Sequence, residues 1–465
     1  MGEPRPPEGG VTTAAPTETT PASGGLGLGA AIALVIGNVV GTGIFLLPAS
    51  LAAFGWVSLF AMGLVTVGAI AMAVVFGRLG ARVPAAGGPY AYARDAFGEF
   101  AGFWNAWSFW LTAWIGNAAI AVAWVGYVQY FARQVFGWDW GGTGTAIIIG
   151  LIGLWIPAVV NLLGAKNMAA FQIVTTILKF VPLLFVGIVG LFFIEWANFG
   201  AFNTTGKNVL GAISLAGAVA LFIYSGVESV AIAAEKIKDP ARNIGKASVV
   251  GVLACAALYL LSTVAVMGTV PQDQLMKSNA PFADALNHMF GGTIWGVIMA
   301  ACAIASGIGA LNGWTMLVAE MPMAAAKDGM FPTAFGRISS RGVPAAGILV
   351  GTVLTSLMLL MGYASENAFN TIVLLASFTT VIPYFFSAAA QIFWLVTEGR
   401  KVQVKRLARD MTIATIALLF AFWMAYGSGA EAVLGGTLML LVGVPVYIWV
   451  KSRRSEFGPR ELKRG

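Results

Sequence analysis

Long apolar runs with almost no charged residues recur along the whole sequence, and they constrain the fold more than any other feature. A helix needs about 20 apolar residues to cross the hydrocarbon core of a bilayer, and its backbone polar groups must bond within the segment. Only 10% of the residues are charged, against roughly 25% in a soluble domain. Runs that fit a membrane span lie near residues 26–52, 56–78, 101–132, 143–163, 168–194, 209–237, 245–270, 291–325, 342–362, 367–396, 411–427 and 432–450. The sequence therefore predicts an all-α polytopic membrane protein with twelve transmembrane helices.

The two ends of the chain are expected to be tails around a single domain. Residues 1–25 are rich in Pro, Gly and Thr and predict a disordered cytoplasmic tail. Residues 451–465 predict a basic cytoplasmic tail, and residues 26–450 predict one domain because only short loops separate the spans. With one His and two Cys, the chain offers no evident metal ligand set and no disulfide framework. No metal or other cofactor is expected.

The distribution of Lys and Arg predicts the orientation of the spans. If the N-terminus lies in the cytoplasm, Arg133, Lys207 and Lys277 fall on the opposite side and Lys179 falls within a span. Every other Lys and Arg then lies in the tails or in cytoplasmic turns, as the positive-inside rule requires. We therefore expect a multi-pass protein of the cell membrane with both termini in the cytoplasm. The net charge of +7 follows from this asymmetry and does not indicate a nucleic-acid partner.

Two spans contain glycine interruptions at matching positions. The first reads GNVVGTGIFLLP and the sixth reads LFIYSGVESV, and each is the first of five consecutive spans. Since five is an odd number, the second copy of the unit must be inserted upside down, and paired interruptions of this kind indicate an inverted-repeat transporter. The expected repeats are residues 26–194 and 209–396, followed by two C-terminal helices. Gly37 and Gly41 also fit a Gly-x-x-x-Gly motif, which would instead indicate close helix packing.

Helices that break at mid-membrane expose backbone groups, which must line a cavity. The N–H groups after the first break would begin a half-helix, and the positive end of a half-helix suits a carboxylate. The carbonyls that end the opposite half-helices would suit an ammonium group. The two breaks therefore predict a receptor for an α-amino acid. The expected donors are the backbone N–H groups of Thr42, Gly43 and Ile44, and the expected acceptors are the carbonyls around Val39 and those of Phe222 and Ser225.

Several motifs occur in an order that is typical of one known family. They are GTGIFLLPA (41–49), GGPYAYARDAFG (87–98), WIGN (114–117), SGVES (225–229), KDPARN (238–243), WTMLVAE (314–320) and KDGMFP (327–332). From about residue 26 to 395, the chain resembles the amino acid–polyamine–organocation (APC) superfamily. Within it, the chain is most similar to the basic amino acid and polyamine antiporters, which include the arginine/agmatine antiporter. The resemblance implies a transporter that acts in the lipid bilayer on a small-molecule substrate, an amino acid or a polyamine. It also implies a homodimer.

The resemblance also implies roles for individual residues. It implies a cradle for the substrate, an aromatic lid, a ring that stacks on a cationic side chain and a gate further from the substrate. Phe222 stands where the family has a gating tryptophan, and Phe109 stands where it has a second gate tyrosine. Stacking of Trp314 on a guanidinium would be worth about 2 kcal/mol when desolvated. The implied substrate residues are Val39, Gly41, Thr42, Gly43, Asn117, Phe222, Ser225 and Trp314, and the implied gate residues are Glu228 and Tyr384.

Lys179 departs from the arginine/agmatine antiporter, which has a small apolar residue at this position of the fifth span. A lysine inside a membrane span costs about 3 kcal/mol, so it is expected to have a function. Other superfamily members resemble this chain in having such a lysine, which there replaces a sodium ion next to the first broken helix. We expect Lys179 to act in coupling together with Glu228. The alternatives are a structural pair with Glu228 or hydrogen bonds to carbonyls near Val39.

These observations predict a secondary transporter that exchanges a cationic amino acid for its decarboxylated amine or for another amino acid. The alternative within this class is proton-coupled uptake of amino acids, with broader or neutral specificity. A membrane-embedded enzyme would need a nucleophile with its base or a metal cluster, and a channel would need a repeated filter or charged rings. Neither pattern is evident in the sequence. Substrate identity is left open at this stage.

Overall fold

The computed structural model of the protein describes residues 26–84, 87–164, 168–398 and 404–453. This part of the chain forms helices joined by turns and loops, with an isolated parallel bridge between Leu26 and Ile237. Ten of its helices are long and apolar enough to cross a membrane. They are α3 (Val57–Arg82), α5 (Glu99–Phe136), α6 (Thr143–Leu162), α7 (Met168–Val189), α10 (Pro240–Thr269), α13 (Ile294–Lys327), α14 (Ala345–Tyr363), α15 (Ala368–Glu398), α16 (Val404–Gly427) and α17 (Gly429–Arg453).

Two further apolar stretches each consist of helical pieces separated by non-helical residues. The first comprises α1 (Leu28–Val39), the 3-10 helix η1 (Thr42–Phe45) and α2 (Leu47–Ala52). The second comprises α8 (Val209–Leu221), η4 (Phe222–Tyr224), α9 (Ser229–Ile232) and η5 (Ala234–Lys236). The structure thus has interruptions at the two places where the sequence predicts them.

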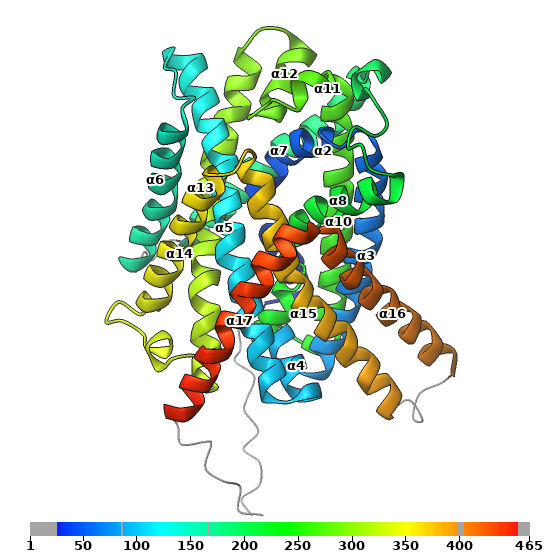
Figure 1. The fold of residues 1–465 in the computed structure, drawn as a ribbon, viewed down its shortest axis with the longest axis vertical. Helices are drawn as coiled ribbons and strands as arrows, with labels where there is room; N and C mark the ends of the chain where they lie inside the picture. Colours follow the sequence, from blue (N-terminus) through cyan, green and yellow to red (C-terminus); the bar gives the residue numbers. More distant parts are fainter. Residues whose placement is uncertain (1–25, 85–86, 165–167, 399–403, 454–465) are drawn as a thin grey trace, which may run out of the picture.

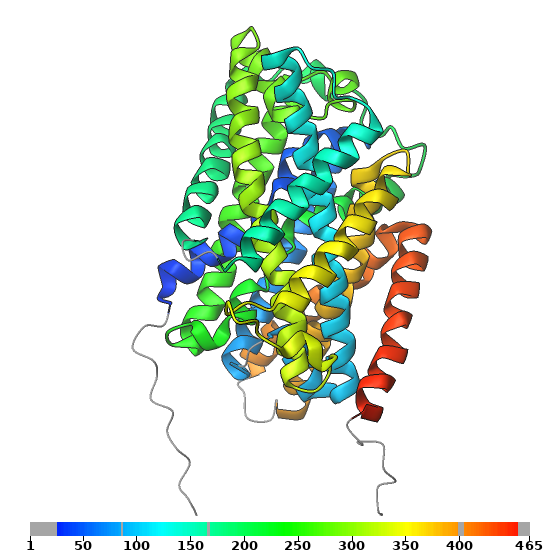
Figure 2. The same cartoon turned by 90° about the vertical axis from the view of Figure 1, so that its left-hand side faces the viewer.

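Short helices cover opposite ends of the bundle. α4 (Pro89–Phe97) connects α3 to α5, whereas α11 (Gln272–Leu275) and α12 (Pro281–Phe290) connect α10 to α13. Figure 1 shows α4 at the bottom of the bundle and α12 at the top, and Figure 2 shows the long helices running between these two ends. We refer to them as the α4 end and the α12 end. The remaining 3-10 helices are η2 (Gly190–Phe193), η3 (Trp196–Phe199) and η6 (Thr333–Gly336).

α5 lies at the centre of the bundle, because it packs extensively against both α13 and α15. Most of its residues are buried. α3 and α10 also pack extensively, and they cross where two glycines meet. A Cβ atom on Gly77 would lie only 2.5 Å from the Cα of Gly245. Such small residues allow helix backbones to approach closely, which is a common basis of helix packing in membranes.

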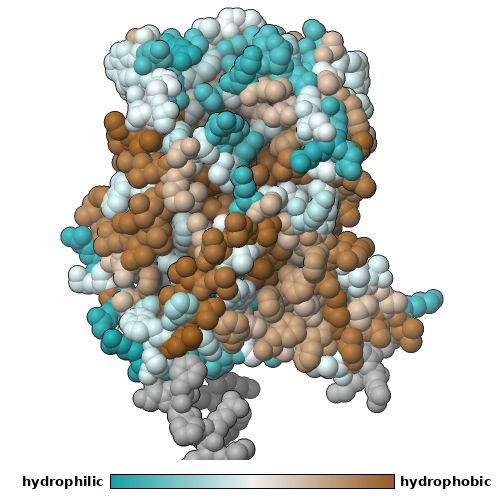
Figure 3. Space-filling model, in the orientation of Figure 1, coloured by the Kyte–Doolittle hydropathy of each residue, from teal (hydrophilic) through white to brown (hydrophobic). Residues whose placement is uncertain are grey.

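The outer surface is apolar around the middle of the long helices. Large hydrophobic side chains such as Ile152, Leu419 and Val442 are exposed. Figure 3 shows hydrophobic residues over the middle of the molecule and hydrophilic residues at the α12 end. α14 has 19 residues and is therefore about 28 Å long, close to the thickness of the hydrocarbon core. An apolar belt of this height is explained by contact with lipid rather than water.

The expected boundaries differ most clearly for the eleventh span. The sequence predicts a span at 411–427, whereas α16 begins at Val404. Its additional turns, at the N-terminal end, carry Lys405, Arg406 and Arg409. Because these residues are charged, the apolar run begins later than the helix does. Long basic side chains at a helix end can reach the membrane interface, so a helix can continue past the hydrocarbon core. The predicted tails, residues 1–25 and most of 451–465, lie outside the described residues.

Candidate functional site

The two helix interruptions lie against each other inside the bundle. α1 ends at Val39, and Gly41 is extended, with φ −88° and ψ 178°, before η1 begins. In the second interruption Ser225 is extended, with φ −61° and ψ 131°, and Gly226 has φ +107°. Glycine adopts such a positive φ at little cost, whereas other residues rarely do. Gly226 therefore allows the chain to leave the axis of the preceding helix.

Gly226 also permits close approach of the two interruptions. A Cβ atom at this position would lie 3.0 Å from the carbonyl oxygen of Asn38 and 3.2 Å from the backbone nitrogen of Val39. The backbones are therefore in contact, with no side chain between them. The sequence predicted Gly226 as the glycine of this interruption, but not its contact with the first interruption.

A small cavity lies between the interruptions. Its volume is about 20 Å³, which is room for about one water molecule. It is lined by Asn38, Val39, Gly41, Gly43, Ile44, Ile120, Phe222, Ile223, Ser225, Tyr259 and Trp314. Six of the predicted substrate residues are among these, and they come from the first, sixth and eighth predicted spans. The backbone of Thr42 begins η1 directly beside the cavity, but its side chain is not described.

The backbone groups of the first interruption differ in whether they are already hydrogen-bonded. Because η1 begins at Thr42, the N–H groups of its first turn lack intrahelical acceptors. The carbonyl of Val39, however, already accepts hydrogen bonds from the Tyr259 hydroxyl at 2.7 Å and from Gly41 N–H at 2.8 Å. A carbonyl oxygen has two lone pairs. The expectation that Val39 offers this oxygen to an ammonium group is therefore not met in this conformation.

The second interruption contains an unsatisfied polar side chain. The hydroxyl oxygen of Ser225 is buried and has no hydrogen-bond partner among the described residues. The carbonyl of Phe222 accepts a hydrogen bond from Ser225 N–H at 3.1 Å, which occupies one of its lone pairs. A buried hydroxyl without a partner is unfavourable. Since Ser225 lines the cavity, a polar ligand there could satisfy it.

Aromatic rings separate the cavity from the α12 end. The ring of Phe222 lies against Gly43, where a Cβ atom would come within 2.6 Å of it. Phe222 also makes an edge-on contact with Phe369, with 6.3 Å between ring centroids. Trp314, on α13, lines the cavity as well. Phe222 thus lies between Gly43 and Phe369, and its role as a lid stays a prediction. Phe369 is a second ring that sequence reasoning did not identify.

The two spaced glycines of the first span do not mediate close helix packing. Among the described residues, a Cβ atom on Gly37 would meet nothing nearer than Thr176 Oγ1, at 4.0 Å. A Cβ atom on Gly41 would meet nothing nearer than Ile120 Cδ1, at 3.9 Å. Both are ordinary van der Waals distances. The described residues therefore show no close packing against this pair.

Lys179 is buried against the first interruption. Its amine donates a hydrogen bond to the carbonyl oxygen of Gly37 at 3.1 Å, and the side chain is 1% exposed. The contact with carbonyls near Val39 is thus the alternative that the structure shows. No ion pair joins Lys179 to Glu228, although both side chains belong to the described part of the chain. A cation at the C-terminal end of α1 is favourable because the helix dipole places negative charge there.

Glu228 and Tyr384 are in contact beside the second interruption. The Glu228 carboxylate accepts hydrogen bonds from the Tyr384 hydroxyl at 3.2 Å and from Gly226 N–H at 3.2 and 3.3 Å. The carboxylate therefore connects α15 to the break itself. Along the chain, Glu228 lies between Ser225, which lines the cavity, and Ile232, which lines a pocket at the α4 end.

Asn117 lies near the cavity but does not line it. Its amide nitrogen is 3.4 Å from Thr315 Oγ1, and its side-chain oxygen is buried without a partner among the described residues. The preceding residue, Gly116, is the one that lies against the ring of Phe222. Tyr259 also lines the cavity, and sequence reasoning did not predict this. The signal in the sequence was a single tyrosine within the apolar run of the seventh predicted span.

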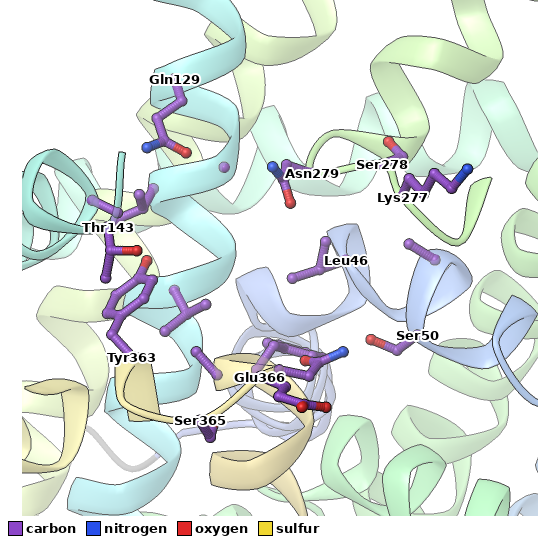
Figure 4. A pocket seen from close by; sticks show the side chains of 18 of the residues that line it. Leu46, Ser50, Gln129, Thr143, Lys277, Ser278, Asn279, Tyr363, Ser365 and Glu366 are labelled. Atoms are coloured by element: carbon purple, nitrogen blue, oxygen red, sulfur yellow. The ribbon is translucent and has the colours of Figure 1, made fainter. Parts of the chain in front are cut away.

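A larger polar pocket, of about 330 Å³, lies towards the α12 end. Figure 4 shows Gln129 on α5 and Asn279 before α12 on opposite sides of it, with Tyr363 at the end of α14 and Glu366 in the turn between α14 and α15. Phe369 lines this pocket and contacts Phe222, which lines the cavity. The pocket is therefore an approach to the cavity, with the two phenylalanine rings between them.

The α4 end has a pocket of its own, of about 560 Å³. Arg94 and Asp328 lie at its margin and form an ion pair at 2.9 Å, which joins α4 to the end of α13. The guanidinium of Arg94 lies over the ring of Tyr90, with 5.4 Å between the guanidinium carbon and the ring centroid. The central cavity therefore has a pocket on either side, and its small volume shows that it is contracted in this conformation.

A contracted central cavity with a pocket on each side, inside a bundle with an apolar surface, defines a multi-pass membrane protein of the transporter class. The description of the family model that matches residues 26–449 is amino acid permease. The chain belongs to this family, which is part of the APC superfamily.

Relatives that match most of the chain include the following three. An arginine/ornithine antiporter of Pseudomonas aeruginosa is 31% identical over 92% of this chain and 91% of its own length. The putrescine transporter PotE of Haemophilus influenzae is 30% identical over 90% of this chain and 95% of its own length. A cadaverine/lysine antiporter of Escherichia coli is 29% identical over 91% and 94%.

Proposed function

We propose that the protein exchanges a cationic amino acid for another such amino acid, or for its decarboxylated amine, by alternating access. The observation that carries this proposal is the cavity between the two helix interruptions, lined by backbone groups, an unsatisfied hydroxyl and aromatic rings. The three relatives support the cationic class, because arginine, ornithine, lysine, putrescine and cadaverine each carry two ammonium or guanidinium groups, whereas a neutral amino acid carries one.

Twelve spans in an inverted repeat are the topology proposed for this activity. The two interrupted stretches would count as the first and sixth spans beside the ten long helices. The positions of α4 and α12 support the inversion, because each precedes the third span of its repeat and they lie at opposite ends of the bundle. The α4 end would face the cytoplasm, since the basic ends of α3 and α17 and the basic start of α16 lie there.

The α-carboxylate of the substrate would bind to the N–H groups at the start of η1, where the helix dipole favours negative charge. The α-ammonium group would bind to the Ser225 hydroxyl and to carbonyls of the second interruption. In the present conformation the Val39 carbonyl is occupied by Tyr259, so it would join the receptor only if Tyr259 moved. Both charges of an amino acid would then be held by backbone and hydroxyl groups.

The cationic side chain would be recognised by aromatic faces. Phe222 and Trp314 line the cavity, and no Asp or Glu is among its described lining residues. A ring face attracts a cation by about 2 kcal/mol when both are desolvated. A neutral amino acid would bind to the same backbone groups without this contribution, which is the basis of the alternative function as a permease of neutral or broader specificity.

Binding requires the contracted cavity to expand. Movement of Phe222 away from Gly43 and Phe369 would join the cavity to the α12-end pocket. Separation of Arg94 from Asp328 would loosen the α4 end. Exchange would consist of these two events in alternation, with Lys179 and Glu228 holding the two interruptions to their neighbours during the cycle.

Flux measurements in proteoliposomes test this proposal. Vesicles loaded with unlabelled arginine, ornithine, lysine, agmatine, putrescine or cadaverine would be diluted into labelled arginine. Exchange predicts rapid uptake of label only when a cationic substrate is inside. Uptake into empty vesicles that depends on a proton gradient would instead support the proton-coupled alternative. Equal counterflow with neutral amino acids would contradict cationic specificity.

A further inference from the structure

The polar pocket at the α12 end has the size of a binding site in its own right. Its volume of about 330 Å³ falls within the range of pockets that bind small molecules, roughly 300–1,000 Å³. The central cavity, by contrast, has about 20 Å³ in this conformation. The pocket at the α12 end therefore has room for an amino acid, whereas the central cavity must first expand.

Two side chains of opposite charge line this pocket. Lys277 belongs to the turn between α11 and α12, and Glu366 belongs to the turn between α14 and α15. Figure 4 shows them on different sides of the pocket. Both residues are exposed, and neither side chain makes an ion pair or a hydrogen bond with the described residues. An ammonium group and a carboxylate are therefore both available to a ligand.

Uncharged polar groups from several helices complete the lining of the pocket. Ser50 comes from α2, Thr143 from α6 and Asn279 from the segment before α12. A few polar groups that converge on one pocket fix the orientation of a small ligand. The lining therefore suits a small molecule that carries both positive and negative charge.

The pocket continues directly towards the central cavity. On α5, Ile120 lines the cavity and Val122 lines the pocket, and two residues of an α-helix correspond to a rise of about 3 Å. In the first interrupted stretch, Ile44 lines the cavity and Leu46 lines the pocket. A molecule in the pocket is therefore a short distance from the cavity, with the two phenylalanine rings described above between them.

We infer that this pocket is an outer site, which binds a cationic amino acid before the amino acid enters the central cavity. Glu366 would bind the cationic side chain, and Lys277 would bind the α-carboxylate. The inference rests on the proposed exchange of cationic amino acids and adds a second binding site to it. The outer site offers a carboxylate to the side chain of the substrate, which the described lining of the central cavity does not.

The two charges would also distinguish an amino acid from its decarboxylated amine. Arginine has a carboxylate for Lys277, whereas agmatine has none and carries no negative charge. Opposite charges attract and like charges repel, so Lys277 favours arginine and disfavours agmatine in the same pocket. The outer site therefore favours loading of the amino acid at the α12 end and release of the amine there.

Protection of a cysteine from labelling tests whether the outer site is occupied. Met276→Cys places a thiol in the lining of the pocket, where Met276 is 45% exposed. Gln274→Cys is the matched control, because Gln274 is exposed on α11 but does not line the pocket. The full-length protein in detergent is labelled with an uncharged, water-soluble maleimide, in the presence of arginine or of leucine. The protein without an introduced cysteine gives the background from Cys255 and Cys302.

Arginine at about twice its dissociation constant should slow labelling of Met276→Cys roughly threefold, because labelling then follows the unoccupied fraction. Leucine should slow it less, and Gln274→Cys should be labelled at the same rate throughout. Addition of Glu366→Gln should remove the protection. Addition of Glu431→Gln, at the start of α17 and outside the pocket, should leave the protection in place. Absence of protection, or protection that survives Glu366→Gln, would overturn the inference.

Uptake kinetics test the preference for the amino acid. In right-side-out vesicles, the ratio of kcat/KM for arginine to kcat/KM for agmatine should fall by about fivefold in Lys277→Gln, because an exposed pair of charges is worth a few-fold. Lys207→Gln is the matched control, since Lys207 is exposed in the loop before α8 and does not line the pocket. An unchanged ratio in Lys277→Gln would overturn the assignment of Lys277 to the carboxylate.

The two experiments separate failure of the outer site from failure of the proposed function. Cysteine protection requires binding but no transport. Protection by arginine without any exchange would refute the proposed function and leave the outer site in place. Exchange of arginine without protection would refute the outer site and leave the proposed function in place.

Discussion

Substitution of Gly226 by alanine should disable the protein, because two separate costs coincide at this position. The φ of +107° is open mainly to glycine, and placing another residue in such a region costs about 1 to 3 kcal/mol. The new Cβ would also press against the backbone of Asn38 and Val39 at 3.0 to 3.2 Å. Overpacking of this kind costs typically 1 to 3 kcal/mol. The arrangement in which the two interruptions touch should therefore be destabilised by about 2 to 6 kcal/mol. Even the lower figure corresponds to a roughly 30-fold loss in the population of this arrangement.

The assay compares Gly226→Ala with Gly37→Ala in the same reconstituted vesicles. The control replaces a glycine of the neighbouring interruption whose Cβ would have room, since its nearest described neighbour is 4.0 Å away. Arginine counterflow and thermal unfolding of the purified protein should be close to wild type for Gly37→Ala. Both should fall for Gly226→Ala, provided that the protein is inserted. Wild-type exchange by Gly226→Ala would refute the argument that the two interruptions touch during transport.

Other substitutions test the cavity and the buried charges. Trp314→Ala should weaken binding of arginine by about 2 kcal/mol, measured by calorimetry, whereas Trp314→Phe should retain part of it. Wild-type affinity in both variants would remove this ring from the site. Gly43→Val should abolish counterflow, because even a Cβ atom would lie 2.6 Å from the neighbouring phenylalanine ring. Normal counterflow by inserted protein would count against the broken-helix site. Glu228→Gln should flatten the pH dependence of exchange between about pH 5 and 8, because the amide carries no charge at any pH. An unchanged pH profile would leave this carboxylate with a structural role. Lys179→Ala should slow turnover more than it weakens binding, because its amine contacts α1 and not the cavity. Equal losses in both quantities would contradict that assignment.

Local properties of the chain were sufficient to predict the overall class and the positions of the breaks. The length of an apolar run determines whether a helix can cross a bilayer, and that quantity is present in the sequence itself. Gly41 and Gly226 lie in motifs where the helical pattern fails, and both adopt non-helical conformations in the structure. Five predicted substrate residues then converge on one cavity, because the two broken stretches pack against each other, and Trp314 joins them from α13.

Contacts between residues on different helices could not be predicted from local properties of the sequence. The sequence left three alternatives for Lys179, and only packing places its amine against Gly37 rather than Glu228. Nothing in the sequence indicated that Tyr259 would occupy the Val39 carbonyl. Asn117 was expected at the substrate, yet the rotation of α5 directs it towards Thr315.

The sequence by itself determined that this chain is a helical membrane protein with two interrupted spans and a buried lysine and carboxylate. Those features follow from hydrophobicity, helix length and the freedom of glycine, which are properties of short segments. The tertiary structure decided which groups meet: Lys179 with Gly37, Tyr259 with Val39, and Arg78 with Asp410. A hydrogen bond or an ion pair depends on distances of a few ångströms, and these distances are set by the depth and rotation of whole helices once they pack.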